Sequence, residues 1–204
     1  MSKREEYKRR GQNSGKRKKN KRHLRKRFLI VCEGERTEPN YFESFKVAKE
    51  LCEIVGVGDN TLRLVREAIS LKEKGNYDEV WVVMDKDDFP SDNFNNALNL
   101  ARQKGVQVAY SNEAFEIWYL LHYHYHNAAI SRSSYKERLT ACLGFEYKKN
   151  IIGIYDVLMD KQSVAIQNAA RLLASYGEYH NPAHDNPCTT VHLLVETLRN
   201  EEPK

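Results

Sequence analysis

The stretch EVWVVMDKDD, residues 79–88, combines a buried strand with the acids that follow it. Residues 80–84 are all apolar, and three of them are valine, a pattern typical of a strand that is covered on both faces. The run leads directly into the acidic segment 85–88. A strand of this kind indicates a parallel sheet with helices on both sides, and it places carboxylates just past the end of the strand.

Helical segments separate this strand from three others. The other candidate strands are 28–32 (FLIVC), 53–57 (EIVGV) and 106–110 (VQVAY). Apolar residues at helical spacing predict helices over 37–51, with Thr37 as the N-cap, and over 61–74, 93–104 and 113–125. Alternating strands and helices predict an α/β fold with a parallel sheet of about four strands and flanking helices. In such sheets, ligands bind outside the carboxyl ends of the strands.

The rest of the chain has a different character at each end. After residue 130 the pattern is helical, with helices near 134–142, 152–176 (broken near Asp160) and 189–200, and no strand is predicted. We therefore divide the chain into three parts. They are a basic disordered tail (1–27), the α/β domain (28–128) and a helical extension packed on the same domain (129–204).

Positive charge is concentrated in the first 27 residues. They contain 14 Lys/Arg and 2 Glu, a net charge of +12, whereas the remainder has 19 basic and 26 acidic side chains, a net charge of −7. The segment has almost no apolar residues to bury, so we predict that it is disordered. A tail this basic attracts nucleic acid by counterion release, without reading sequence. A solubilising or ribosome-associating extension is the alternative.

The sequence lacks the features of membrane and secreted proteins. No apolar run approaches the roughly 18 residues of a transmembrane helix, and the basic N-terminus has no apolar signal-peptide core. The four cysteines, at positions 32, 52, 142 and 188, form no CxxC pair. We predict a cytoplasmic protein with reduced thiols and no membrane partner.

Carboxylates follow three of the predicted strands. Glu33 follows the first strand, Asp85 and Asp87 follow the third, and Glu116 lies in the helix after the fourth. Because the carboxyl ends of parallel strands meet at one edge of a sheet, these acids are expected to converge. Converging acids repel one another unless a cation neutralises them, and oxygen ligands suit Mg²⁺ or Mn²⁺. In a locally extended chain, Asp85 and Asp87 point to the same side.

A cation held by such acids keeps open positions for water and for phosphate oxygens. We assign Glu33, Asp85 and Asp87 as catalytic and metal-binding residues. Glu116 is assigned as a further metal ligand. Turn residues and helix caps are the ordinary alternative for acids that follow strands. That alternative is favoured for Glu35 and stays open for Glu116, because a helix N-terminus also accommodates a lone glutamate.

Four segments, in order along the chain, closely resemble motifs of the RloB-like family. They are VCEGERTEPNYF (31–42), VWVVMDKDD (80–88), SNEAFEIWYLLHY (111–123) and NPCTTV (186–191). The family looks like a branch of the Toprim superfamily, the α/β catalytic domain of primases, topoisomerases and OLD-type nucleases. The resemblance implies a glutamate after the first strand, matched by Glu33, and an Asp-x-Asp after a later strand, matched by Asp85 and Asp87.

The resemblance also implies an activity and a partner. The activity is that of a Mg²⁺-dependent Toprim-type endonuclease acting on DNA or RNA, tRNA included, as an effector of antiphage defence by abortive infection. The partner is an AAA- or ABC-type ATPase, and the chain itself has no GxxxxGK[ST] phosphate-binding motif. Toprim nucleases often carry a basic residue near the catalytic acids, for which Lys86 and Arg36 are the candidates. The sequence leaves a homo-oligomer open.

Other functions and other clusters compete with this hypothesis. A non-catalytic nucleic-acid-binding or regulatory subunit of an ATPase sensor complex would keep the same fold. Nucleotidyl transfer would need a nucleotide site that the sequence does not reveal. The histidines at 122, 124 and 126 do not share one helix face, which favours a structural or substrate-facing role over zinc. The group His180, His184 and Cys188 has metal-like spacing but lacks a nearby fourth ligand.

Overall fold

The computed structural model describes residues 25–47, 49–58 and 61–203. The strands are β1 (Phe28–Cys32), β2 (Cys52–Gly56), β3 (Glu79–Asp85), β4 (Gln107–Asn112) and β5 (Cys188–Thr189). The α-helices are α2 (Thr37–Phe42), α3 (Thr61–Lys74), α4 (Ser91–Gln103), α5 (Glu116–Leu121), α6 (Tyr135–Leu143), α7 (Ile154–Leu158), α8 (Gln162–Ala174) and α9 (Val191–Glu201). Short 3-10 turns are η1 (Arg132–Ser134), η2 (Met159–Lys161) and η3 (Gly177–Tyr179).

The five strands form one sheet in the order β2-β1-β3-β4-β5. The first four are parallel and agree with the four predicted strands to within two residues at each end, so the predicted α/β fold is confirmed. From β1 the chain moves outward to β2 and then crosses back over β1 to β3. The direction of winding therefore reverses between β1 and β3, and this reversal opens a crevice outside their carboxyl ends.

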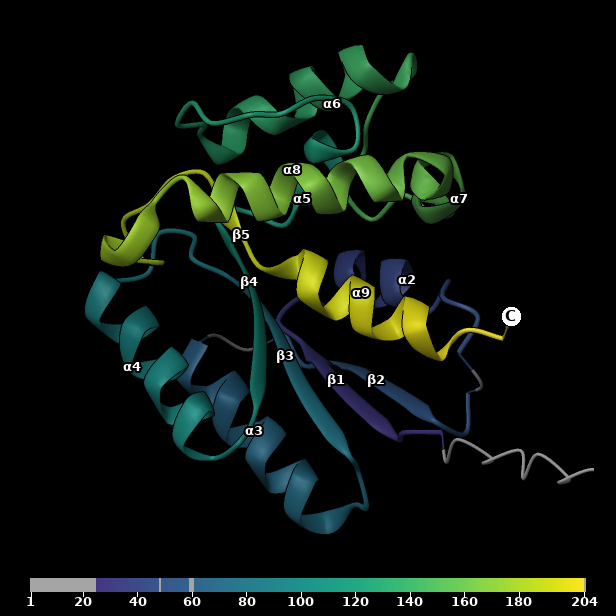
Figure 1. The fold of residues 1–204 in the computed structure, drawn as a ribbon, viewed down its shortest axis with the longest axis vertical. Coiled ribbons are helices and arrows are strands. Elements are labelled where there is room, and N and C mark those ends of the chain that lie inside the picture. Colours follow the sequence, from purple (N-terminus) through teal and green to yellow (C-terminus); the bar gives the residue numbers. More distant parts are fainter. Residues whose placement is uncertain (1–24, 48, 59–60, 204) are drawn as a thin grey trace, which may run out of the picture.

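Helices cover both faces of the sheet, and every residue of β1 is fully buried. Side chains alternate along the strand, so Phe28, Ile30 and Cys32 belong to one hydrophobic core while Leu29 and Val31 belong to another. The helices α3 and α4 cover one face, and α2 and α9 lie on the other (Figure 1). In the same view, α5 to α8 stack above α9, which adds a helical layer beside the carboxyl end of β4 (Figure 1).

The C-terminal region contains a strand that the sequence did not predict. β5 pairs antiparallel with the end of β4, through Ser111 with Thr189 and Asn112 with Cys188. The hydroxyl of Thr189 also donates to the carbonyl of Tyr110, at 3.0 Å. A two-residue strand is too short to show an alternating pattern, so the prediction of helices alone was wrong here. The predicted break near Asp160 is confirmed, since η2 separates α7 from α8.

Two helices near the carboxyl edge are shorter than predicted. α2 ends at Phe42, and Thr37 is its first residue; the Thr37 hydroxyl donates to Asn150 Oδ1 at 2.6 Å and does not cap the helix. α5 begins at Glu116 because Glu113 has other partners. The Glu113 carbonyl accepts from the backbone N–H of Asp87 at 3.1 Å, and its carboxylate accepts from the backbone N–H of Arg132 at 2.7 Å.

The described residues include only the end of the predicted basic tail. Residues 1–24 of the tail lie outside the described residues. Its last residues are attached to the sheet, since Lys26 pairs with Glu79 and the N–H of Arg27 donates to Asp78. The boundary at residue 128 stays a prediction, although one hydrophobic core contains residues from both sides of it. Within the described ranges, no helix is both long and apolar enough to cross a membrane, and all four cysteines are free.

Candidate active site

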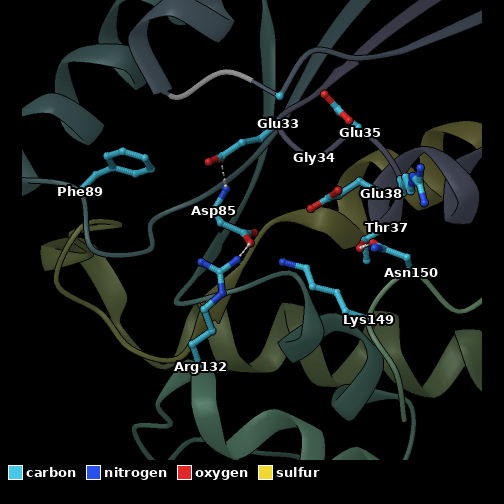
Figure 2. A pocket seen from close by; sticks show the side chains of 12 residues that line it. Glu33, Gly34, Glu35, Thr37, Glu38, Asp85, Phe89, Arg132, Lys149 and Asn150 are labelled. Carbon is cyan, nitrogen blue, oxygen red and sulfur yellow. Dashed lines mark hydrogen bonds and ion pairs between the residues drawn. The ribbon is translucent and has the colours of Figure 1, made fainter.

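An open pocket of about 630 Å³ lies at the carboxyl ends of β1 and β3, where the winding of the sheet reverses. Four acids line it, Glu33, Glu38, Asp85 and the exposed Glu35, together with the cations Arg132, Lys149 and the exposed Arg36. Figure 2 shows the carboxylates of Glu38 and Asp85 and the Lys149 ammonium directed toward the same space, with the Glu33 carboxylate turned to the backbone N–H of Asp85. Glu33 lies in the β1–α2 loop, Glu38 in the first turn of α2 and Asp85 at the end of β3. Arg132 lies in η1, and Lys149 lies between α6 and α7.

Glu33 and Asp85 are joined directly. The backbone N–H of Asp85 donates to the Glu33 carboxylate at 2.9 Å, and the N–H of Glu33 donates to the carbonyl of Val83 at 2.9 Å. The carbonyl of Glu33 accepts from the N–H of Gly58 at 2.9 Å. Glu33 is therefore held between β2 and β3, and the structure brings together these two predicted residues, which lie 52 positions apart.

Burial and mutual repulsion disfavour negative charge at this edge of the sheet. Burial raises the pKa of Glu33 to about 7, with smaller contributions from nearby acids. Asp85 is only 6% exposed, and burial followed by the charges of Glu38, Glu116 and Glu33 raises its pKa well above the usual range. A group of acids that is difficult to ionise together is the arrangement expected where a cation binds.

Glu38 is a site residue that sequence analysis did not identify. It lies in the first turn of α2 and is buried, and its Oε2 has no hydrogen-bond partner among the residues that the structure describes. Burial, with a contribution from Glu116, raises its pKa. A Cβ on Gly34 would lie 2.2 Å from Glu38 Oε2, so the glycine leaves the room that this carboxylate occupies. The sequence signal is the third acid of EGERTE (33–38), which falls in the first turn of the predicted helix.

Glu116 lies behind the main pocket. It is buried in the first turn of α5, and the Tyr147 hydroxyl donates to its Oε1 at 3.2 Å. It lines a neighbouring pocket, which shares Arg132 and Lys149 with the first one. Its charge still influences Glu38 and Asp85, which places it at the edge of the acid group.

Asp87 does not line the acid pocket as placed. Its φ of +43° shows that the chain is not extended there, so the predicted two-residue alternation of Asp85 and Asp87 was wrong. Aspartate tolerates this left-handed conformation better than most residues. The two acids instead share a cation, because the Arg132 guanidinium pairs with Asp87 and lies 3.6 Å from Asp85.

The basic residues differ from the two candidates chosen from the sequence. The ammonium of Lys86 donates to the carbonyls of Asp87 (3.2 Å) and Phe89 (2.5 Å), so it stabilises the turn after β3. Arg36 is exposed at the rim of the pocket. The cations at the acids are Arg132 and Lys149, which lie outside all four family-like segments and had no signal beyond their charge.

The donor chemistry fits a hard divalent cation. The acid side chains offer oxygen ligands alone, and one buried oxygen, Oε2 of Glu38, lacks a partner in the described part of the chain. As placed, no three His, Cys, Asp or Glu side chains within the described ranges are close enough to hold an ion. Holding one therefore requires side-chain rotation, including movement of Arg132 away from Asp85 and Asp87.

The histidine clusters lie elsewhere in the fold. His122 is 1% exposed and packs edge-on against Trp118, whose carbonyl is 2.8 Å from its Nδ1, so it is a core residue. Burial lowers its pKa to about 4. His180 lies between Asp185, at 2.5 Å from Nδ1, and the Tyr110 hydroxyl, at 2.7 Å from Nε2.

Comparison with known proteins agrees with the four family-like segments. The family model described as RloB-like protein matches residues 28–198, which is most of the chain. No curated protein matches the sequence. The match includes β1, which Glu33 follows, and β3, which ends at Asp85, as well as most of the helical C-terminal region. The chain therefore belongs to the RloB-like protein family.

Proposed function

We propose that this protein is a metal-dependent phosphodiesterase that cleaves DNA or RNA. The main support is the grouping of the buried Glu38 and Asp85 with the half-buried Glu33 around one pocket at the reversal point of the sheet, with Arg132 and Lys149 beside them. Keeping repelling acids together costs stability, and folded proteins retain such clusters chiefly at functional sites. The family resemblance to Toprim nucleases supports the same reaction class.

Each residue has a distinct role in this proposal. Glu33, Glu38 and Asp85 would hold Mg²⁺ or Mn²⁺, and Asp87 and Glu116 would complete the acid group from its two edges. When bound, the ion supplies charge stabilisation to the phosphoryl group and lowers the pKa of a water molecule. Glu33 would hold the ion or assist proton transfer.

The two cations suit the other half of the reaction. A guanidinium binds phosphate oxygens in a bidentate manner, and an ammonium adds a compact charge. Arg132 would exchange its present partners, Asp85 and Asp87, for a phosphate once the ion neutralises the acids. Lys149, directed into the pocket in Figure 2, would contact the same group.

The partners and the biological role follow from the family and the composition. The +12 charge of residues 1–27 supports contact with nucleic acid. An AAA- or ABC-type ATPase partner and a role in antiphage defence by abortive infection rest on the resemblance alone. A cytoplasmic location rests on the cysteine pattern and on the absence of an apolar run or signal-peptide core in the sequence. A homo-oligomer stays open.

The test is cleavage of labelled DNA and tRNA with Mg²⁺ or Mn²⁺. Asp85→Asn should lower the rate by on the order of 10²–10³-fold, since it removes a charge that acts directly on the reacting group. Asp88→Asn is the matched control, because Asp88 is exposed in the same turn and should leave the rate within about twofold. Equal rates for the two variants would reject the assignment.

A second function is favoured by one contact. Arg132 already neutralises Asp85 and Asp87, as a structural cation would in a non-catalytic nucleic-acid-binding or regulatory subunit of an ATPase complex. Calorimetry with Mn²⁺ separates the two functions. For a nuclease, wild type binds the ion, and Arg132→Ala binds it more tightly while losing cleavage. Absence of binding in both proteins would favour the second function.

A further inference from the structure

A second pocket, of about 330 Å³, adjoins the acid pocket and shares Arg132 and Lys149 with it. It lies between the start of α5 and α6 and is lined by seven side chains, four of them cationic. The cations are Arg132, Lys136, Lys148 and Lys149, and the others are Glu116, Tyr135 and Tyr147. One pocket is therefore rich in acids, its neighbour is rich in cations, and two basic residues stand between them.

The charge of this segment is opposite to that of its surroundings. Residues 132–149 contain five Lys/Arg and two Glu, a net charge of 5 − 2 = +3. The whole of residues 28–204 has a net charge of −7, so all of it outside this segment sums to −10. Residues 132–149 are thus a positive segment beside the acids in a region that is otherwise negative. An anion would be attracted to this segment and repelled by the rest of the surface.

An unpartnered buried hydroxyl lies in the same pocket. Tyr135 is 1% exposed, and its hydroxyl has no hydrogen-bond partner among the described residues. Buried polar groups are normally paired, so an orphan hydroxyl that lines a pocket indicates a missing acceptor. A phosphate oxygen would supply that acceptor.

Glu146 restrains two of the four cations. Its carboxylate lies 2.8 Å from the ammonium of Lys136 and 3.7 Å from that of Lys148. All three side chains are more than half exposed, so these pairs are weak and can be exchanged for a ligand. Glu146 therefore competes with any anion that enters the pocket.

We infer that the basic pocket is a second phosphate site, which binds the backbone phosphate next to the one cleaved in the acid pocket. The inference rests on the proposed function for the identity of its ligand, a nucleic-acid strand. Arg132 and Lys149 contact the strand between the two pockets, and Lys136 and Lys148 hold it in the second. The strand thus crosses from the carboxyl end of β3 toward α6.

Binding without cleavage tests this site. The affinity of the full-length protein for a fluorescent single-stranded oligonucleotide, as DNA and as RNA, is measured in EDTA over a series of salt concentrations. In Lys136→Ala/Lys148→Ala, the slope of log affinity against log salt should fall by about 0.7 for each lysine that contacts a phosphate. Affinity at low salt should fall several-fold.

The matched control is Lys74→Ala/Lys104→Ala. These lysines are also exposed, but they end α3 and α4 and so lie at the opposite edge of the sheet. The charge change is the same, and the basic tail is present in every protein. Equal slopes for the two double variants would overturn the inference.

Glu146→Gln gives an effect of the opposite sign. Removing this competitor should strengthen binding several-fold and steepen the salt slope, which a loss of folding would not do. Unchanged or weaker binding would contradict the site. Because all of these measurements exclude metal, they are independent of catalysis. If Asp85→Asn loses cleavage but the lysine variants bind like wild type, the proposed nuclease stands and the second phosphate site is rejected. If binding depends on the lysines but the protein does not cleave, the second phosphate site stands and the nuclease is rejected.

Discussion

β3 begins with Glu79 and ends with Asp85, and the two carboxylates lie in opposite surroundings. Glu79 is partly exposed and accepts from the ammonium of Lys26 at 2.5 Å and from the indole N–H of Trp81 at 3.2 Å. Asp85 is buried among other carboxylates, and Arg132 lies 3.6 Å away. Glu79 at the amino edge thus has a cation of its own, whereas at the carboxyl edge Asp85 shares Arg132 with Asp87 and still experiences repulsion from Glu38, Glu116 and Glu33.

The difference indicates that acids lower the stability of the ion-free protein at the carboxyl edge of the sheet and not at the amino edge. A carboxylate paired with lysine at the surface contributes little but costs little. Buried carboxylates that face one another lower the stability of the ion-free fold, and that cost is removed when a cation binds. The effects of substitutions at the two edges can therefore be compared, with Glu79 as the reference for the acids at the carboxyl edge.

The largest expected effect is the pH dependence of Glu33. Its pKa is about 7 in the folded protein and 4.5 ordinarily, so between these values the folded state holds a proton that the unfolded chain releases. Stability is thus fully present below pH 4.5 and is lost as pH rises through 7, by up to about 3 kcal/mol. In EDTA, Glu33→Gln should become more stable than wild type by that amount between pH 5 and 8, as measured by urea unfolding.

Glu79→Gln provides the comparison at the other end of β3. Its free energy of unfolding should stay at a constant offset from wild type over the same pH range. If the Glu33→Gln curve also runs parallel to wild type, the carboxyl edge stores no repulsion, and the contrast between the two edges disappears.

The next effect is stabilisation by the ion itself. At pH 8, Mn²⁺ at a concentration 100 times its dissociation constant should raise the free energy of unfolding by about 2.7 kcal/mol. Asp85→Asn should lose most of this increase, while Asp88→Asn, exposed in the same turn, should keep it. Thermal unfolding with and without the ion measures both. An increase that survives Asp85→Asn would place the ion elsewhere.

A smaller effect is expected from Gly34→Ala. The added methyl group would displace the end of the flexible Glu38 side chain, so the fold should lose only about 1 kcal/mol. Metal affinity should fall about tenfold, because Glu38 is then turned away from the other acids. Calorimetry with Mn²⁺ measures the affinity, and Glu38→Gln should reproduce it. Unchanged affinity in both variants would remove Glu38 from the site.

The elements with strong local patterns could be predicted from the sequence. β1 and α3 have the predicted limits, because one is a continuous apolar run and the other has apolar residues at helical spacing before Gly75. Glu33 and Asp85 could be placed together because both directly follow strands, and parallel strands end at a common edge. Their contact then depends only on β1 and β3 being neighbours in the sheet, as they are.

The remaining parts depend on contacts between distant segments. β5 exists only as a partner of β4, and Arg132 reaches the acids because η1 folds back over the end of β3. Neither has a local period or motif. Asp87 was misplaced because its left-handed backbone depends on the turn that Lys86 stabilises through two carbonyls. Such features follow from tertiary packing and not from spacing along the chain.

The smallest effect is expected at the pair of Lys26 and Glu79. Its side chains are 51% and 23% exposed, so water screens the attraction and ordering the lysine offsets part of it. Lys26→Met should lower the free energy of unfolding by about 0.5 kcal/mol or less, and the difference should vanish in 1 M salt. Urea unfolding at low and high salt measures it. A loss near that expected for Glu33 would mean that the amino edge is as strongly coupled as the carboxyl edge, and the asymmetry that identifies the acid pocket as functional would no longer hold.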